Sequence, residues 1–265
     1  MKTKEEVFTG FKMSGILMLI LNILLICLIT VSFIWAVDPS NNGGSIKVAV
    51  LIIDTVLFIF NCMFWGGFMQ IEPNEAMVLL FFGKYSGTIK ENGFYWVNPF
   101  YTKKKLTLRA RNLDAEPIKV NDKSGNPIMI GVVVVWHVSD TYKATFDIDS
   151  ESMLTAVAAN SATHKVNERM KSYQNFVKVQ SDSALRSVAG MYSYDHSGTD
   201  NPNDLTLRSG GEEINDILEN QLNERLSIAG IHVIEARINY LAYAPEIAAV
   251  MLRRQQAEAI IAARE

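Results

Sequence analysis

Two long apolar runs near the beginning of the chain stand apart from the more polar sequence that follows. No charged residue occurs from Met13 to Val37, and the segment from Ile16 to Trp35 supplies about the twenty apolar positions that a helix needs to cross a bilayer. A second run, from Val48 to Phe68, contains a single charge, Asp54. A buried core hairpin is the alternative, but core helices are usually shorter. The pattern therefore predicts a membrane anchor over residues 1–70, with spans at about 14–37 and 46–69.

Turn-forming residues separate the two runs, from Asp38 to Ser45, and this polar loop has to reach water. Lysines gather before the first run and after the second, whereas Lys47 alone borders the loop. The positive-inside rule then places both ends in the cytoplasm. We expect a cell-membrane protein with two spans and cytoplasmic N- and C-termini.

The sequence beyond the anchor begins with strand patterns. The apolar segment from Ala76 to Phe82, ended by Gly83, is typical of a strand buried on both faces. Ile128 to Val138 includes four consecutive valines, which favour a strand strongly.

Helical periodicity dominates the second half. Apolar residues from Leu154 to Met170 recur on one helical face, and Ser209 with Glu212 forms a capping-box pattern before a helix that extends to Leu226. Ile231 to Asn239 alternates like a strand, and Pro245 opens a final helix. The polar segment 192–211 is predicted to be a surface insertion.

Composition narrows the class of protein. Cys27 and Cys62 are the only cysteines of the 265 residues, and both lie in the apolar runs, so no disulfide framework or cysteine-rich metal site is expected outside the membrane. The net charge of −3 and the absence of a basic helix argue against nucleic acid as a partner.

Several motifs then occur in a recognisable order. Ile71-Glu72-Pro73-Asn74-Glu75 leads into the strand that ends at Gly83-Lys84, and Gly93-Phe94-Tyr95-Trp96-Val97-Asn98-Pro99-Phe100 follows. Near the end come Ala229-Gly230-Ile231-His232-Val233, then Ala244-Pro245-Glu246-Ile247, then Arg253-Arg254-Gln255-Gln256-Ala257. Over residues 71–265 this resembles the band 7 (SPFH) domain shared by stomatins, prohibitins and flotillins.

The resemblance implies an α+β SPFH domain over 71–244 and the start of a coiled-coil assembly helix over 245–265. It also implies a non-enzymatic scaffold without a cofactor, whose subunits form rings or cages on the membrane. Its expected partners are further copies of itself, membrane lipids and a membrane-bound protease. The two spans and the insertion depart from the commonest pattern of that family.

The residues alone show no catalytic or metal motif: Gly-x-Ser-x-Gly, a Walker motif and paired zinc histidines are all missing from the sequence. His164 and Glu168 stand four apart on a predicted helix, but a structural zinc site needs more ligands. Asp147, Asp149 and Glu151 resemble part of a calcium loop, although helix capping by Asp149 or Ser150 is the better reading.

Polar residues inside the spans form the first candidate site. If the spans fold back about Asn41 and Asn42, Asn22 lies opposite Asn61 and Asp54 lies near Thr30. Packing within the hairpin is the leading interpretation. Contact with another subunit or a partner helix is the second interpretation, and proton or ion transport is the third.

Two further candidate surfaces lie outside the spans. The first combines aromatic residues and cations suited to a membrane interface, with an ordinary core strand as the alternative: Phe94, Tyr95, Trp96, Phe100, Tyr101, Lys103, Lys104 and Lys105. The second is an assembly face on the last helix, with fold-back on its own domain as the alternative: Ile247, Val250, Met251, Arg253, Arg254, Glu258, Ile260 and Ile261.

Three functions fit this sequence to different degrees. A non-enzymatic scaffold that organises a membrane patch or restrains a protease is the leading hypothesis. A small transporter or channel subunit with a cytoplasmic regulatory domain is the alternative from another class. A membrane-tethered hydrolase would need active-site residues that the sequence does not display.

Overall fold

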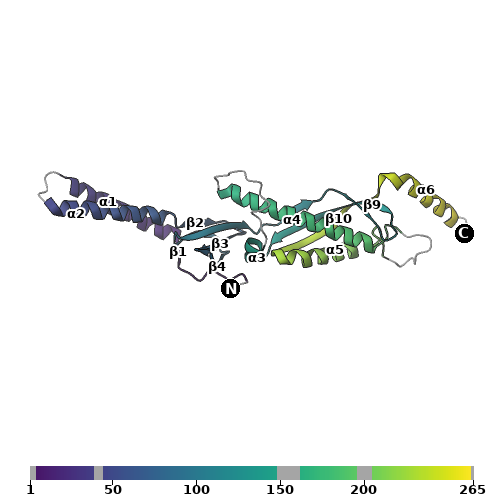
Figure 1. Ribbon diagram of the computed structural model, residues 1–265, viewed down its shortest axis with the longest axis horizontal. Coiled ribbons are helices and arrows are strands. Elements are labelled where there is room, and N and C mark those ends of the chain that lie inside the picture. Colours follow the sequence, from purple (N-terminus) through teal and green to yellow (C-terminus); the bar gives the residue numbers. More distant parts are fainter. Residues whose placement is uncertain (1–3, 39–43, 148–161, 196–204, 264–265) are drawn as a thin grey trace. The chain divides into compact units, whose positions relative to one another are not determined.

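A computed structural model describes residues 4–38, 44–147, 162–195 and 205–263 of the chain (Figure 1). It contains two compact units, residues 1–108 and residues 109–265. The first unit therefore includes both apolar helices and the first six strands. Strands on either side of the hairpin pair with one another, so the contacts of the first unit extend across residue 70.

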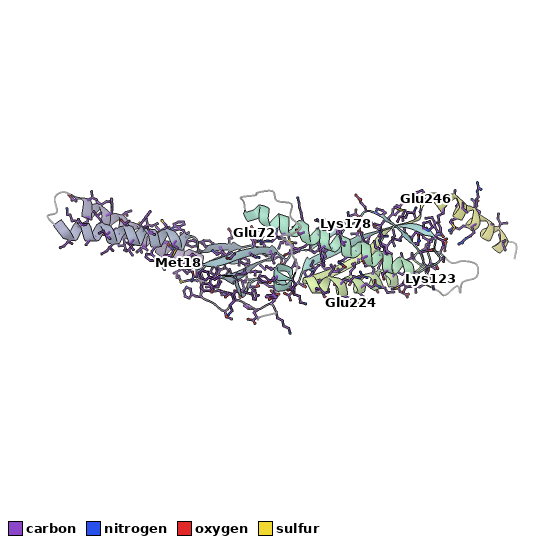
Figure 2. All side chains as sticks on the ribbon, viewed as in Figure 1. Met18, Glu72, Lys123, Lys178, Glu224 and Glu246 are labelled. Carbon is purple, nitrogen blue, oxygen red and sulfur yellow. The ribbon has the colours of Figure 1, made fainter. Side chains whose placement is uncertain are left out.

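The hairpin of the first unit consists of α1 (Gly15–Val37) and α2 (Gly44–Trp65). Both are long and apolar enough to be candidate membrane spans, as the hydrophobic pattern predicts. Most of their large apolar side chains are exposed, including Leu24, Val31, Ile53 and Phe60. Side chains project outward along both helices (Figure 2). A soluble protein would not leave such a surface in water.

Two small antiparallel sheets complete the first unit. One has the order β1 (Lys12–Ser14), β5 (Gly93–Val97), β2 (Phe68–Ile71), and the other has the order β4 (Lys84–Ile89), β3 (Glu75–Phe81), β6 (Tyr101–Thr107). Their shared core is formed by Phe8, Met69, Ile71, Met77, Leu79, Ile89 and Val97. As predicted, β3 is buried on both faces from Ala76 to Leu80, whereas Phe81 at its end is exposed.

The segment before α1 also belongs to this core. The amide of Phe8 donates to Thr88 O at 3.1 Å, and the amide of Thr88 donates to Glu6 O at 2.9 Å. Gly87 is required here, because a Cβ at this position would lie 2.6 Å from the Phe8 Cα. β1 then pairs with β5 from Lys12 to Ser14. The residues on both sides of the hairpin are thus held in one sheet.

The second unit is built on a four-stranded antiparallel sheet. Its long strands are β9 (Pro127–Val138) and β10 (Ile231–Tyr243). The far edge of β9 pairs with two short strands, β7 (Arg111–Asp114) and β8 (Ile118–Asn121). Pro117 lies between these two strands. Because proline has no amide hydrogen, it cannot donate a backbone hydrogen bond to β9.

Three helices accompany this sheet in the second unit: α3 (Thr141–Phe146), α4 (Ala162–Met191) and α5 (Gly211–Leu226). α4 and α5 lie along the sheet (Figure 1). Alternate residues of β9 from Ile128 to Val138 are buried, whereas the intervening ones are half-buried except for Gly131, which is also buried. α5 buries Ile214, Leu218, Leu222 and Leu226, one residue per turn. A short 3-10 turn, η1 (Ser227–Ala229), ends at Gly230, which has a left-handed conformation.

Two local expectations about helices need comment. The capping-box prediction is wrong: Gly210 precedes α5 without a side-chain cap, and the Ser209 hydroxyl lies 2.8 Å from the Thr206 hydroxyl instead. The predicted helix around Leu154 falls partly on residues 148–161, outside the described residues. α6 (Pro245–Ala262) begins at the predicted proline.

Candidate functional site

The polar residues of the hairpin lie at two levels. At the level nearer the strands, Asn61 Nδ2 donates to Asn22 Oδ1 at 3.2 Å across the two helices. Asn22 in turn donates to Met18 O, and Trp65 Nε1 donates to Asn61 Oδ1 at 3.3 Å. The two asparagines are almost fully buried. Such small interhelical networks favour close packing of apolar helices in a membrane.

Asp54 and Thr30 form the second level, on opposite walls of a groove between α1 and α2. The structure does not join them by a hydrogen bond, because the Thr30 hydroxyl donates to Cys27 O at 2.8 Å within its own helix. Asp54 is buried, and its Oδ2 lacks a hydrogen-bond partner among the described residues.

The predicted interfacial aromatics divide into buried and exposed groups. Trp96 is buried and donates from Nε1 to Phe64 O at 2.9 Å. Tyr95 and Tyr101 pack against the core of the first unit. These three residues therefore do not form a free membrane-facing surface. Only Phe94 and Phe100 of the predicted set are exposed, and Phe94 stacks on Phe68.

A different aromatic cluster is exposed at the turn between β3 and β4. Phe82 is 78% exposed and stacks on Phe100 with ring centroids 6.1 Å apart. Phe81 contacts Phe82 edge-on. The turn also carries local strain, because Phe82 has a φ of 45° and is followed by Gly83 at 83°. A bulky side chain is uncommon there, where Asn or Gly is preferred. The consecutive phenylalanines were visible in the sequence, but the pattern assigned them to a buried strand.

The predicted lysines are held by local partners. Lys103 Nζ donates to Gly66 O at 2.7 Å and to Phe68 O at 3.1 Å, just after the end of α2. Burial lowers the pKa of Lys103. Lys105 pairs with Glu75 at 2.6 Å, and Lys104 is half-buried on β6. Lys103 thus satisfies the carbonyls at the junction of α2 and β2.

α6 presents two different faces. Met251 is 8% exposed, and Gln255 Nε2 donates to Asp195 Oδ2 at 3.1 Å, so one face contacts the rest of the second unit. Ile247 and Arg254 are half-buried and Arg253 is exposed. Four large apolar residues outside this contact are exposed: Val250, Leu252, Ile260 and Ile261. Val250, Ile260 and Ile261 lie on one side of the helix, and Leu252 lies on another. The predicted assembly face did not include Leu252 or Gln255, and the side chain of Glu258 lies outside the described residues.

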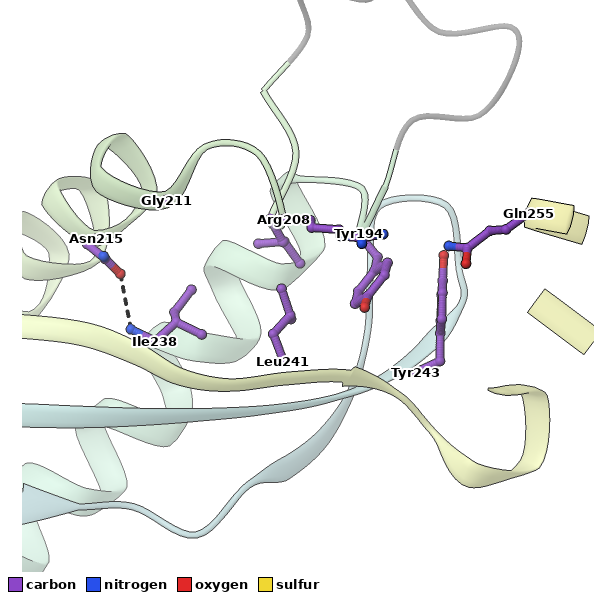
Figure 3. Close-up of a pocket in the computed structure, with 9 residues that line it drawn as sticks. Tyr194, Arg208, Gly211, Asn215, Ile238, Leu241, Tyr243 and Gln255 are labelled. Carbon is purple, nitrogen blue, oxygen red and sulfur yellow. Dashed lines mark hydrogen bonds between the residues drawn. The ribbon is translucent and has the colours of Figure 1, made fainter. Parts of the chain in front are cut away.

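A polar cavity of about 530 Å³ lies beside α6 and the start of α5 (Figure 3). Tyr194 and Tyr243 line it with ring centroids 4.0 Å apart. Burial, partly opposed by Arg254, raises the pKa of Tyr243 to about 12. Arg208 at the cavity pairs with Asp195 at 3.2 Å. Periodicity could not predict this cavity, because its walls come from segments distant in sequence.

Within the part of the chain that the structure describes, no three His, Cys, Asp or Glu side chains come together as metal ligands. Asp147 follows the end of α3, and Asp140 is the residue that caps this helix. Asp149, Ser150, Glu151 and the side chains of His164 and Glu168 lie outside the described residues.

Comparison with known proteins supplies the family. A search of curated proteins found no match to the chain. A family profile described as SPFH domain / Band 7 family matches residues 69–265, well over half of the chain. The match begins at β2 and covers the rest of the first unit as well as the whole second unit. The chain therefore belongs to the SPFH domain / Band 7 family, with an α+β fold preceded by two candidate membrane spans.

Proposed function

We propose that this protein is a non-enzymatic membrane scaffold that assembles into a ring or cage on the cytoplasmic face and organises a membrane microdomain. Members of the SPFH domain / Band 7 family are typically membrane-associated scaffolds and generally lack enzymatic activity. The proposal extends this family property to self-assembly, to lipids as partners and to restraint of a membrane-bound protease. Nucleic acid is not among the proposed partners.

The first unit supports anchoring by a two-span hairpin. β1 precedes the hairpin and pairs with β5, which follows it. This pairing supports placing both ends of the hairpin on the same side of a membrane. The lysine distribution favours the cytoplasmic side. The exposed cluster of Phe81, Phe82 and Phe100 lies beside β6, whose Lys103 contacts the end of α2. We infer that this cluster contacts lipid head groups.

The observation that carries the assembly proposal is the uncovered apolar face of α6. Val250 is 65% exposed although its neighbour Met251 is buried. A helix with exposed apolar residues is stabilised when a second helix covers them. Arg253 beside these residues can set the register through ion pairs with an adjacent subunit.

The mass of the detergent-solubilised particle tests this function. A very large homo-oligomer is the expected result. A monomer or dimer, measured in two mild detergents to exclude dissociation by one of them, would remove the scaffold proposal.

Cysteine labelling tests the topology. In a background lacking Cys27 and Cys62, a cysteine at Asn42 should react with an impermeant reagent from outside the cell. A cysteine at Asp195 should react only after permeabilisation. The reverse pattern would overturn the assignment of the cytoplasmic face.

Transport is the second candidate function, and Asp54 is the observation that favours it. A buried carboxyl group without a hydrogen-bond partner among the described residues is a feature of proton relays. Transport usually requires several ionisable groups in the membrane, and Asp54 is the one acidic residue in either span. A proton flux through proteoliposomes that Asp54→Asn abolishes would favour this alternative over the scaffold.

A further inference from the structure

A groove of about 370 Å³ runs between α1 and α2 on the surface of the hairpin. Its walls are mainly apolar and include Ile29, Phe33 and Ile34 from α1 and Phe58 from α2. Asp54 is the charged residue of the groove, and it lies well inside α2 rather than at either end. A mainly apolar groove with one acidic group in the middle of a candidate membrane span suits a transmembrane helix rather than a water-soluble ligand.

The Asp54 carboxyl group is buried but lacks a donor. Asp54 is 5% exposed, and its Oδ2 has no hydrogen bond among the described residues. The two threonine hydroxyl groups that line the groove donate elsewhere. Thr30 donates to Cys27 O at 2.8 Å, and Thr55 donates to Leu51 O at 2.8 Å. A carboxylate at this depth of a bilayer is costly unless a donor or cation reaches it.

A second copy of this hairpin has no cation to offer at that level. α1 contains no basic residue, and Lys47 is the one basic residue of α2. Lys47 lies about 10 Å along the helix axis from Asp54 at a rise of 1.5 Å per residue, and it donates to Asp38 O at 2.5 Å. Asn22 and Asn61 are already bonded to each other. A cation for Asp54 would therefore have to come from another kind of chain.

We propose that this groove docks a transmembrane helix of a different protein, which carries a lysine or arginine at the depth of Asp54. The proposal rests on the membrane anchoring proposed above. The basic group pairs with the Asp54 carboxylate, while apolar residues of the docked helix cover Phe33 and Phe58. This gives the scaffold a way to select integral membrane partners by one buried charge, in addition to any contact made by its cytoplasmic domain.

The experiment uses the full chain in proteoliposomes and a synthetic probe. The probe is a Leu/Ala transmembrane peptide of about twenty residues with a single central lysine, and its matched control has methionine at that position. Binding is measured by energy transfer to a fluorophore on the chain. Photocrosslinking from position 58, inside the groove, is compared with position 60, which does not line the groove and is 52% exposed.

We expect the lysine peptide to bind about tenfold more tightly than the methionine peptide, within the range of intramembrane polar contacts. Asp54→Asn should remove most of this difference, while Cys62→Ser, an exposed change on the same helix, should preserve it. The peptide should crosslink to position 58 and not to position 60.

Equal binding of the two peptides, or a lysine preference that survives Asp54→Asn, would overturn the proposal. Crosslinking of position 58 to a second copy of the chain, with no displacement by the peptide, would also overturn it. Carbonate extraction and particle mass are measured on the same samples. A chain that is extracted by carbonate contradicts the proposed anchor, whereas an integrated, large particle without peptide preference contradicts only this inference.

Discussion

Asn223 of α5 hydrogen-bonds both backbone polar groups of Val233 on β10. Its Oδ1 accepts from the Val233 amide at 2.8 Å, and its Nδ2 donates to the Val233 carbonyl at 3.2 Å. About two turns earlier, Asn215 Oδ1 accepts from the Ile238 amide at 3.1 Å. β10 is an edge strand of its sheet, and both contacts occur where its pairing with β9 is irregular. The two asparagines therefore protect this edge from pairing with another chain.

Replacing Asn223 with alanine should destabilise the second unit by about 1–3 kcal/mol, because it leaves a donor and an acceptor of Val233 unsatisfied. The measurement is thermal or denaturant unfolding of the detergent-solubilised protein, followed by circular dichroism. Asn220→Ala is the matched control, since Asn220 is exposed on the same helix. Equal stability of the two variants would contradict the role assigned to Asn223.

Substitutions on α6 should separate assembly from folding. Val250→Asp places a charge on the exposed face, so we expect the large particle to dissociate while the melting temperature of the domain changes little. Met251→Asp places a charge on the buried face and should destabilise the second unit by about 3 kcal/mol. Sizing and circular dichroism are measured together, with Gln256→Asp as an exposed control. An unchanged particle in Val250→Asp would remove α6 from the assembly surface.

Phe82 should contact the membrane. A cysteine at position 82, in a background without Cys27 and Cys62, is labelled with an environment-sensitive fluorophore. Its emission should shift to shorter wavelength in proteoliposomes and be quenched by lipids brominated near the head group. The same label at Phe146, an exposed position of the second unit, serves as the comparison. Emission typical of water at position 82 would refute the contact.

Phe82→Asn tests the strain at the same turn. Asparagine adopts a positive φ more readily than phenylalanine, so this variant should be as stable as the wild type or more stable by up to about 1 kcal/mol. Loss of membrane contact with retained stability would indicate that Phe82 is kept for the contact. A clear loss of stability would show that the aromatic cluster is structural.

His137 should make the second unit sensitive to mild acid. Its ring lies 5.4 Å from that of His232 across β9 and β10. Burial first, and then the charge of His232, lowers the pKa of His137 below 6.5. The stability that neutral His137 contributes is therefore complete above 6.5 and is lost as the pH falls through the lower folded value.

The melting temperature of the wild type should accordingly fall between about pH 7 and pH 5, and His137→Gln should fall less over the same range. Glu246 titrates separately. The side-chain hydrogen bond from Lys119 lowers the pKa of Glu246 below 4.5, so its contribution is lost only at more acid pH. Identical profiles for the wild type and His137→Gln would exclude His137 as the sensor.

The sequence by itself was sufficient for elements whose pattern is local. The apolar runs predicted α1 and α2, the valines predicted β9, and Pro245 predicted the start of α6. The ordered motifs also predicted the family that the profile match establishes. Each of these signals depends on the spacing of residues along one helix or strand, which is a property of neighbouring positions.

Only the tertiary structure decided which of these residues are covered. In the structure Trp96 is buried and Phe82 is exposed, and Met251 packs against the domain while Val250 is exposed. Lys103 donates to the carbonyls of Gly66 and Phe68. The structure also joins β1 to β5 across the hairpin. The physical reason is that exposure and hydrogen bonding depend on contacts between segments far apart in the chain, and the spacing of residues within one element does not specify which other element will cover it.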